Sequence, residues 1–169
     1  ELWRSAGDFA ARLAARGAKR GDRLLISLES SEHVLTLYIA CARGGFVACP
    51  VDPELPARRL DPLIALIRPA QTIASPDLAG ILASPEAPAC PLDEGSPDDD
   101  FLVILSSGTT GEPKGIVHSL RSIVESAASF GRLAGLGPDT VVYHHFPMFY
   151  MAGIFNLFLS PPLPRPPGP

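Results

Sequence analysis

The sequence predicts an α/β fold in which helices are layered on a parallel β-sheet. Short apolar runs alternate with stretches of helical periodicity along the chain, which is the pattern of such layered domains. The apolar run at residues 101–105 lacks the period-two alternation of a half-exposed strand, so we expect a central parallel strand covered on both faces. A length of 169 residues and a hydrophobic content of 46% allow one domain with a real core.

The first predicted elements are a helix, a strand and a second helix. The first helix ends near Gly17, and its apolar stripe consists of Leu2, Phe9 and Leu13. A strand is expected over residues 23–28. Ser31 is a candidate N-cap for a helix that runs to Gly44. That helix is apolar on nearly every side, which predicts that it is largely buried.

A second strand and helix follow, and then a short strand and a connection. Residues 46–51 form a strand candidate that the Asp52-Pro53 turn closes. The next helix carries an amphipathic stripe formed by Leu60, Leu63, Ile64 and Ile67. A short strand is expected around residues 72–73. Residues 84–97 are rich in proline and acidic residues, which indicates a surface connection.

After the central strand, one helix and one further strand are predicted. The strand is placed over residues 141–146, and the helix is indicated by Ile123, Val124, Ala127 and Phe130. His144 and His145 are adjacent on that strand and would face opposite ways, so we expect no joint metal site. The acidic run at residues 98–100 is interpreted as a solvated loop edge before the central strand.

The chain is divided into a partial domain over residues 1–160 and an unstructured tail over residues 161–169. The tail contains six prolines, which no helix or central strand tolerates. It is interpreted as a truncated end or a frame change, with a polyproline ligand as the alternative. The chain begins without methionine, so a cut at this end is considered as well.

Composition argues against several kinds of partner. The net charge is −4, from 14 basic and 18 acidic residues without a basic stripe, so nucleic acid is not expected as a partner. The three cysteines, Cys41, Cys49 and Cys90, have a spacing that fits no metal motif. The most apolar stretch, residues 146–159, is too short to span a bilayer. Unpaired cysteines and a charged N-terminus without signal-peptide features predict a cytoplasmic protein.

The most informative segment is residues 106–115, Ser-Ser-Gly-Thr-Thr-Gly-Glu-Pro-Lys-Gly, which directly follows the central strand. Its three glycines allow tight turns that expose backbone N–H groups, and four hydroxyl side chains supply further donors. Lys114 adds a positive charge, and successive N–H groups in such a loop can form an anion-binding nest. The segment therefore predicts a polyphosphate site.

Two common nucleotide motifs do not fit this loop. A Walker A loop has Gly-Lys-Ser/Thr starting five residues after its first glycine, whereas Pro113 stands five residues after Gly108 and Gly115 follows Lys114. The dinucleotide pattern Gly-x-Gly-x-x-Gly is not present in the segment. A Gly/Thr-rich surface turn remains the alternative, which the lysine and the preceding buried strand disfavour.

The segment resembles the phosphate loop of the acyl-adenylate-forming superfamily, which includes acyl-CoA synthetases, aryl-CoA ligases and the adenylation domains of peptide synthetases. The family pattern is Thr/Ser-Ser-Gly-Thr/Ser-Thr-Gly-x-Pro-Lys-Gly after a hydrophobic strand, and the chain matches it throughout. Further similarity lies at residues 21–26, 31–50 and 147–153. The chain departs from the family's Thr-His pair at Ser119 and Leu120, and from a later histidine at Tyr150.

The resemblance implies an enzyme that activates a carboxylic acid with ATP and Mg²⁺ and then transfers the acyl group to a thiol, commonly that of CoA. It assigns ATP binding to Ser106, Ser107, Gly108, Thr109, Thr110, Gly111 and Lys114. In this assignment the lysine stabilises charge. The substrate pocket would include Tyr150 and Gly153, and an aromatic core position on an apolar helix is the alternative for Tyr150. Residues 146–156 contain no acidic residue to pair with a substrate amino group, which favours a fatty or aryl acid.

The resemblance covers only the N-terminal part of such an enzyme, because the later family motifs, including a catalytic lysine, are absent from the sequence. No catalytic residue is therefore assigned, and the chain alone is expected to be inactive. A truncated or degenerate chain with at most weak nucleotide binding is the alternative. An unrelated phosphate-binding α/β domain is a third hypothesis, and the oligomeric state is left open.

Overall fold

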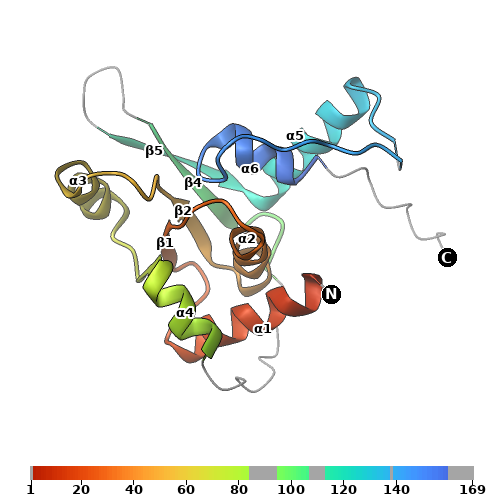
Figure 1. Cartoon of the computed structure of the whole chain (residues 1–169). Coiled ribbons are helices and arrows are strands. Elements are labelled where there is room, and N and C mark those ends of the chain that lie inside the picture. Colours follow the sequence, from red (N-terminus) through yellow and green to blue (C-terminus); the bar gives the residue numbers. More distant parts are fainter. Residues whose placement is uncertain (1, 84–94, 107–112, 138, 160–169) are drawn as a thin grey trace.

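The computed structural model describes residues 2–83, 95–106, 113–137 and 139–159. Within them the chain forms alternating helices and strands (Figure 1). The helices are α1 (Leu2–Ala15), α2 (Glu32–Gly44), α3 (Ala57–Ile67), α4 (Ser75–Ala83), α5 (Leu120–Leu133) and α6 (Met151–Leu157). The strands are β1 (Arg23–Ser27), β2 (Val47–Pro50), β3 (Gln71–Ala74), β4 (Asp100–Ser106) and β5 (Lys114–Ser119). The predicted tail lies outside the described residues.

The strands form one mostly parallel sheet in the order β3-β1-β2-β4-β5. Strand β1 pairs in parallel with both β2 and β3, and β2 pairs in parallel with β4. Strand β5 runs antiparallel to β4 at one edge of the sheet. The predicted α/β fold with a layered parallel sheet is confirmed, and the antiparallel edge strand is an addition to it.

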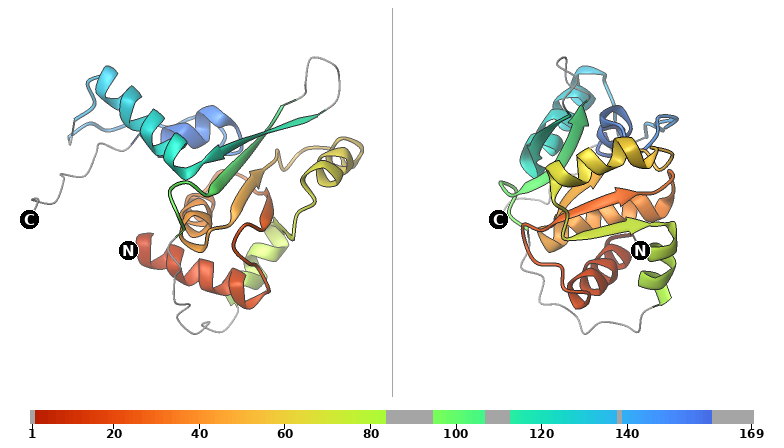
Figure 2. Two further views of the ribbon diagram at one scale, coloured as in Figure 1. Left: turned by 180° about the vertical axis from the view of Figure 1, so that it is seen from behind. Right: turned by 90° about the vertical axis from the view of Figure 1, so that its left-hand side faces the viewer.

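Helices cover both faces of the sheet, but unequally. The larger core joins α1 and α2 to one face, where Leu24 and Ile26 of β1 are buried. The smaller core joins α3 to the opposite face through Leu25 and Ile67. This division follows from the alternation of side chains along a strand. Figures 1 and 2 show α1 and α3 on opposite sides of the sheet.

The central strand β4 supplies side chains to both cores. Phe101 and Leu102 both belong to the larger core, although they are consecutive. A register shift between Asp100 and Leu102 accounts for this, because an irregularity in the pairing changes the alternation of side chains. Val103 then belongs to the smaller core, so β4 is covered on both faces there, as the sequence predicts.

Helix α2 forms the buried centre of the larger core, as its apolar sequence predicts. Its side chains Leu37, Tyr38 and Cys41 are fully buried. Ser31 occupies the N-cap position, although its side chain makes no capping hydrogen bond. The helix ends where Gly45 adopts a left-handed conformation with φ of 66°, which favours glycine.

Three elements differ from the sequence-based expectation. Helix α4 was not predicted, although Ser75 and Pro76 form a helix-start signal and the Asp77 carboxylate accepts a hydrogen bond from the Ala74 amide (3.0 Å). Strand β5 was not predicted either, because the predicted loop motif includes Lys114 and Gly115, and residues 116–119 were assigned to no element. The strand predicted over residues 141–146 is wrong: this segment has no strand pairing, and its aromatic rings stack on one another.

Candidate functional site

The predicted phosphate loop joins the two strands of the β4–β5 hairpin. Ser106, the last residue of β4, is paired with Lys114, the first residue of β5. The two ends of the motif therefore lie side by side on the sheet, which fixes where the loop begins and ends. The predicted phosphate ligands Ser107, Gly108, Thr109, Thr110 and Gly111 lie outside the described residues. Their assignment stays a prediction from the motif.

Lys114 is exposed at the point where the loop returns to the sheet. Within the described part of the chain its side chain has no hydrogen-bond or ion-pair partner, so its charge is available to a ligand. Gly115 follows it and is paired with Leu105. A Cβ atom at Gly115 would lie 3.0 Å from Val103 Cγ1, so a side chain there would crowd the neighbouring strand.

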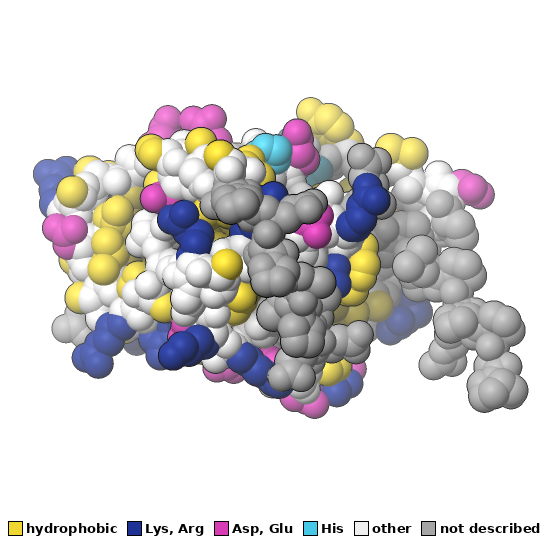
Figure 3. All heavy atoms as spheres, turned by 90° about the horizontal axis from the view of Figure 1, so that it is seen from below, with side chains coloured by type: hydrophobic (Ala, Val, Ile, Leu, Met, Phe, Trp, Pro, Cys, Tyr) yellow, Lys and Arg dark blue, Asp and Glu magenta, His cyan; other side chains and the backbone are white. Residues whose placement is uncertain are grey.

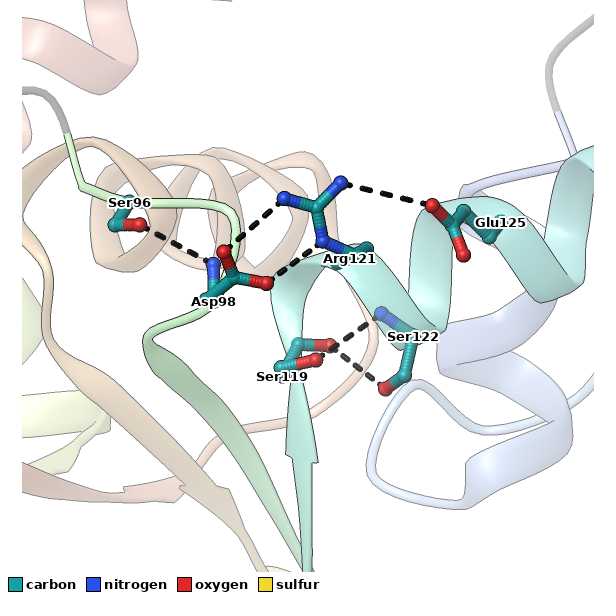
Figure 4. A network of polar contacts seen from close by, with 6 residues as sticks. All are labelled: Ser96, Asp98, Ser119, Arg121, Ser122 and Glu125. Atoms are coloured by element: carbon teal, nitrogen blue, oxygen red, sulfur yellow. Dashed lines mark hydrogen bonds and ion pairs between the residues drawn. The ribbon is translucent and has the colours of Figure 1, made fainter.

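Polar contacts hold the outer ends of the same hairpin together. The Arg121 guanidinium donates to both oxygens of the Asp98 carboxylate, at 2.7 and 3.1 Å, and lies 3.7 Å from Glu125 (Figure 4). The Arg121 amide also donates to the Pro97 carbonyl at 2.7 Å. The hydrogen bond from Arg121 holds the pKa of Asp98 below its usual value. The turn before β4 is thereby attached to the first turn of α5.

Ser119 begins α5 as its N-cap. Its Oγ accepts a hydrogen bond from the Ser122 amide at 3.2 Å, and its carbonyl accepts one from the Ser122 hydroxyl at 2.9 Å (Figure 4). A threonine, which the family usually has at this position, carries the same hydroxyl, so the departure at Ser119 preserves the capping chemistry.

A hollow of about 420 Å³ lies beside the hairpin. Its wall includes Leu105 and Pro113, which flank the predicted phosphate loop, and Tyr150, which is 54% exposed. The lining also includes the end of β2 and the first turns of α3, which contributes Arg58 and Arg59. The structure thus places one of the two predicted pocket residues in a cavity next to the predicted ATP loop.

The turn that carries Tyr150 is held in place by a side chain of α2 and by Ser30, which precedes α2. The Tyr38 hydroxyl donates to the Met148 carbonyl at 2.6 Å, and the Met148 amide donates to Ser30 Oγ at 2.9 Å. The Tyr150 amide donates to the Pro147 carbonyl at 3.1 Å. Two backbone groups of this turn are therefore fixed by side chains from elsewhere in the fold, which positions Tyr150 at the hollow.

Gly153, the second predicted pocket residue, is buried in α6 and does not line the hollow. A Cβ atom there would lie 2.0 Å from the Pro147 carbonyl oxygen. His144 Nε2 lies 2.8 Å from the Gly153 carbonyl oxygen. Only glycine allows this approach of α6 to the preceding turn, and the role of Gly153 in substrate binding stays a prediction.

Sequence reasoning missed the two arginines of the hollow. They are consecutive residues in the first turn of α3, and Arg59 stands four residues before Leu63 of the apolar stripe that predicted the helix. A pair of adjacent basic residues at the start of the predicted helix, a few residues after the Asp52-Pro53 turn, was the available signal. The described residues contain no group of three or more His, Cys, Asp or Glu side chains that could hold a metal ion.

The fold and the loop motif are those expected of the acyl-adenylate-forming class of enzymes. Residues 1–161 match the AMP-binding enzyme family, so the chain belongs to this family. The chain is 30% identical over 157 residues to the nonribosomal peptide synthetase ivoA of Emericella nidulans, covering 82% of this chain and 9% of that protein. It is 28% identical over 174 residues to the long-chain-fatty-acid–CoA ligase FadD13 of Mycobacterium tuberculosis, covering 88% of this chain and 34% of that protein.

Solved structures share the fold of this chain. The complex of VinN with 3-methylaspartate matches with a TM-score of 0.82 and 23% identity, covering 94% of this chain and 50% of VinN. ATP-bound MatB from Rhodopseudomonas palustris matches with a TM-score of 0.81 and 26% identity, covering 95% of this chain and 38% of MatB. The chain therefore spans half or less of the length of these relatives.

The surface charge and the length of the helices are relevant to the predicted partners. The face in Figure 3 carries basic and acidic side chains next to one another rather than a field of one sign. Among the described helices, none is both long enough and apolar enough to cross a membrane.

Proposed function

We propose that this chain is the N-terminal part of an enzyme that activates a carboxylic acid with ATP and then transfers the acyl group to CoA. The observation that carries the proposal is the position of Lys114. Its charge is exposed at the end of the phosphate-loop motif, on a hairpin that also walls a cavity containing Tyr150. Membership of the AMP-binding enzyme family supports the use of ATP.

The first step has an electrostatic barrier, because an anionic carboxylate must approach an anionic triphosphate. A carboxylate oxygen attacks the α-phosphorus, the bond from that phosphorus to the bridging oxygen breaks, and pyrophosphate leaves. In our assignment, Lys114 and the loop residues 106–111 stabilise negative charge on the β- and γ-phosphates. Mg²⁺ bound with the ATP phosphates would supply further charge stabilisation.

The second step transfers the acyl group to a thiol. The thiol sulfur attacks the acyl carbon, the bond from that carbon to the AMP oxygen breaks, and the thiol proton passes to solvent. Tyr150 lies at the cavity beside the loop, where it would contact the acyl group or the entering thiol. The absence of acidic residues from 146–156 favours a fatty or aryl acid, and CoA is the proposed acceptor.

The relatives differ in which acid and which acceptor they support. FadD13 is a fatty-acid–CoA ligase, which supports the proposed acid and acceptor. The peptide synthetase ivoA and VinN with its bound amino acid favour an amino acid instead. A cytoplasmic location is part of the proposal, because Cys41 and Cys49 are free thiols within the described residues.

The test is acid-dependent exchange of labelled pyrophosphate into ATP, measured over fatty, aryl and amino acids. The complete product of the gene should catalyse exchange with a fatty or aryl acid, whereas the 169-residue chain alone should not. Exchange with amino acids only would overturn the substrate assignment. No exchange by the complete product with any acid would favour the second candidate, a non-catalytic chain, for which the small share of each relative that the chain covers is the specific support.

A further inference from the structure

We propose that Arg58 and Arg59 form a subsite for the phosphate of the thiol acceptor, at the rim of the hollow beside the predicted ATP loop. This inference rests on the proposed function and deepens it, because it assigns residues to the second substrate. The ligand chemistry is that of a phosphopantetheine group: a phosphate at one end, a long uncharged arm and a terminal thiol.

The two arginines give the rim an excess of positive charge. Both side chains line the hollow and are exposed, and neither has a hydrogen-bond or ion-pair partner within the described residues. The acidic residue of the lining is Asp52, and its Oδ1 already accepts a hydrogen bond from the Glu54 amide at 2.9 Å. Two guanidinium groups are thus available to an anion, and guanidinium geometry matches phosphate oxygens in pairs.

The rest of the hollow suits an uncharged arm. Apart from the arginines and Asp52, the lining is apolar for the most part and includes Leu55, Leu63, Ile104, Leu105, Phe149 and Met151. Pro113, next to the predicted phosphate loop, and Tyr150 also line the hollow. A ligand whose anion rests on α3 can therefore pass along apolar side chains and bring its other end to the place where the acyl-adenylate would form.

The arginines are exposed, which indicates that the anion they bind belongs to the thiol acceptor rather than to the carboxylic acid. A second carboxylate on the acid would have to be held in an enclosed pocket while the first reacts. The phosphate of a long thiol ligand can stay at the surface in contact with water, where exposed arginines bind it with little desolvation. The phosphate could belong to free CoA or to phosphopantetheine on a carrier protein, and the experiment separates these sources.

The experiment compares CoA with pantetheine, which has the same arm and thiol but lacks the phosphates. Binding of each to the complete gene product is titrated by ligand-observed NMR. The wild type should bind CoA more tightly than pantetheine. The double variant R58A/R59A should lose roughly tenfold or more in CoA affinity, because tenfold is about the low end for the loss of a single charge-assisted contact, while pantetheine is unaffected. The matched control is Arg4→Ala, an exposed arginine of α1 that does not line the hollow.

Each alternative result has a defined meaning. If CoA and pantetheine bind equally to the wild type, or R58A/R59A changes neither, the subsite does not exist. If R58A/R59A weakens binding of adipate relative to hexanoate but leaves CoA unchanged, the arginines serve the acid and the proposal is overturned. A larger effect on a phosphopantetheinylated carrier protein than on CoA identifies the carrier as the source. Pyrophosphate exchange by the unaltered protein needs no thiol, so it tests the proposed function separately.

Discussion

At the residue scale, Lys114 carries the ATP assignment, and its replacement is the most direct test. Lys114→Ala removes one charge-assisted phosphate contact, worth roughly 1.5–3 kcal/mol, so exchange by the complete protein should fall about 10- to 150-fold. The side chain is exposed and packs into neither core, so the melting temperature should not change. Exchange kinetics and a thermal melt of the same preparation measure both quantities.

Thr109→Ala is the matched comparison within the same motif. A neutral hydroxyl contributes about 1 kcal/mol net, so this variant should lose less activity than Lys114→Ala. If Lys114→Ala lowered the melting temperature strongly while exchange per folded molecule stayed at the wild-type level, the lysine would have a structural role.

Also at the residue scale, Cys41 and Cys49 are chemically protected thiols. Both are fully buried. Burial raises the pKa of Cys41, with a further contribution from Cys49, and burial raises the pKa of Cys49 to about 12 despite the opposing effect of Arg23. The thiolate is the reactive form, so neither residue should be alkylated by iodoacetamide in native buffer at about pH 8. Mass spectrometry of the labelled peptides measures this, and rapid labelling of either cysteine would contradict it.

The same raised pKa values predict how stability depends on pH. In the unfolded chain a cysteine ionises near its ordinary pKa of about 8.5, whereas in the folded chain it stays neutral to a higher pH. The stabilisation is therefore complete below about pH 8.5 and is lost as the pH rises toward about 12. The melting temperature should fall across this window, and Cys49→Ala should reduce the slope. A flat profile would mean that the thiols titrate alike in both states.

At the scale of elements, the Ser119 cap decides how α5 begins. Ser119→Ala removes the acceptor for the Ser122 amide and should lower stability by about 0.5–2 kcal/mol, whereas Ser119→Thr should retain most of it. Urea unfolding of the three proteins measures the difference. If the alanine variant were as stable as the wild type, water would be satisfying the first turn of α5 equally well.

The elements also show where sequence patterns were sufficient. The apolar periodicity of α2 and the unbroken apolar run of β4 predicted buried elements, because burial on all sides leaves a signal in the sequence itself. Strand β5 left no such signal, because it is a short edge strand that exists through its pairing with β4. Residues 141–143, Val-Val-Tyr, have high β-propensity, yet within the described residues no strand pairs with them.

At the scale of the whole molecule, the kind of site could be predicted from the sequence, but the residues that line the hollow beside it could not. The motif at 106–115 identified the family because glycines, hydroxyls and a lysine occur there in a fixed order. The hollow needs three-dimensional packing: Arg59 on α3, Leu105 on β4 and Tyr150 before α6 are far apart in the sequence. No local pattern joins these positions, which is why the arginine pair was missed.

The uncovered surface of the whole chain leads to a prediction about association. Ile116 and Val117 are adjacent on β5 and so face opposite ways, yet they are 51% and 53% exposed. Both faces of the edge strand are therefore uncovered, and Leu133 at the end of α5 is 86% exposed. Exposed apolar side chains and an open strand edge favour self-association.

We expect the 169-residue chain to form oligomers and to bind the dye ANS, with both signals increasing over a concentration series. The double variant I116T/V117T keeps β-branched side chains but lowers the apolar area, so it should shift the light-scattering mass toward the monomer. Leu82→Thr, on α4 away from this edge, is the control, because Leu82 is similarly exposed at 44%. A monomeric chain with a sharp melt and no dye binding would contradict this prediction. It would mean that the exposed apolar side chains of β5 and α5 do not cause self-association.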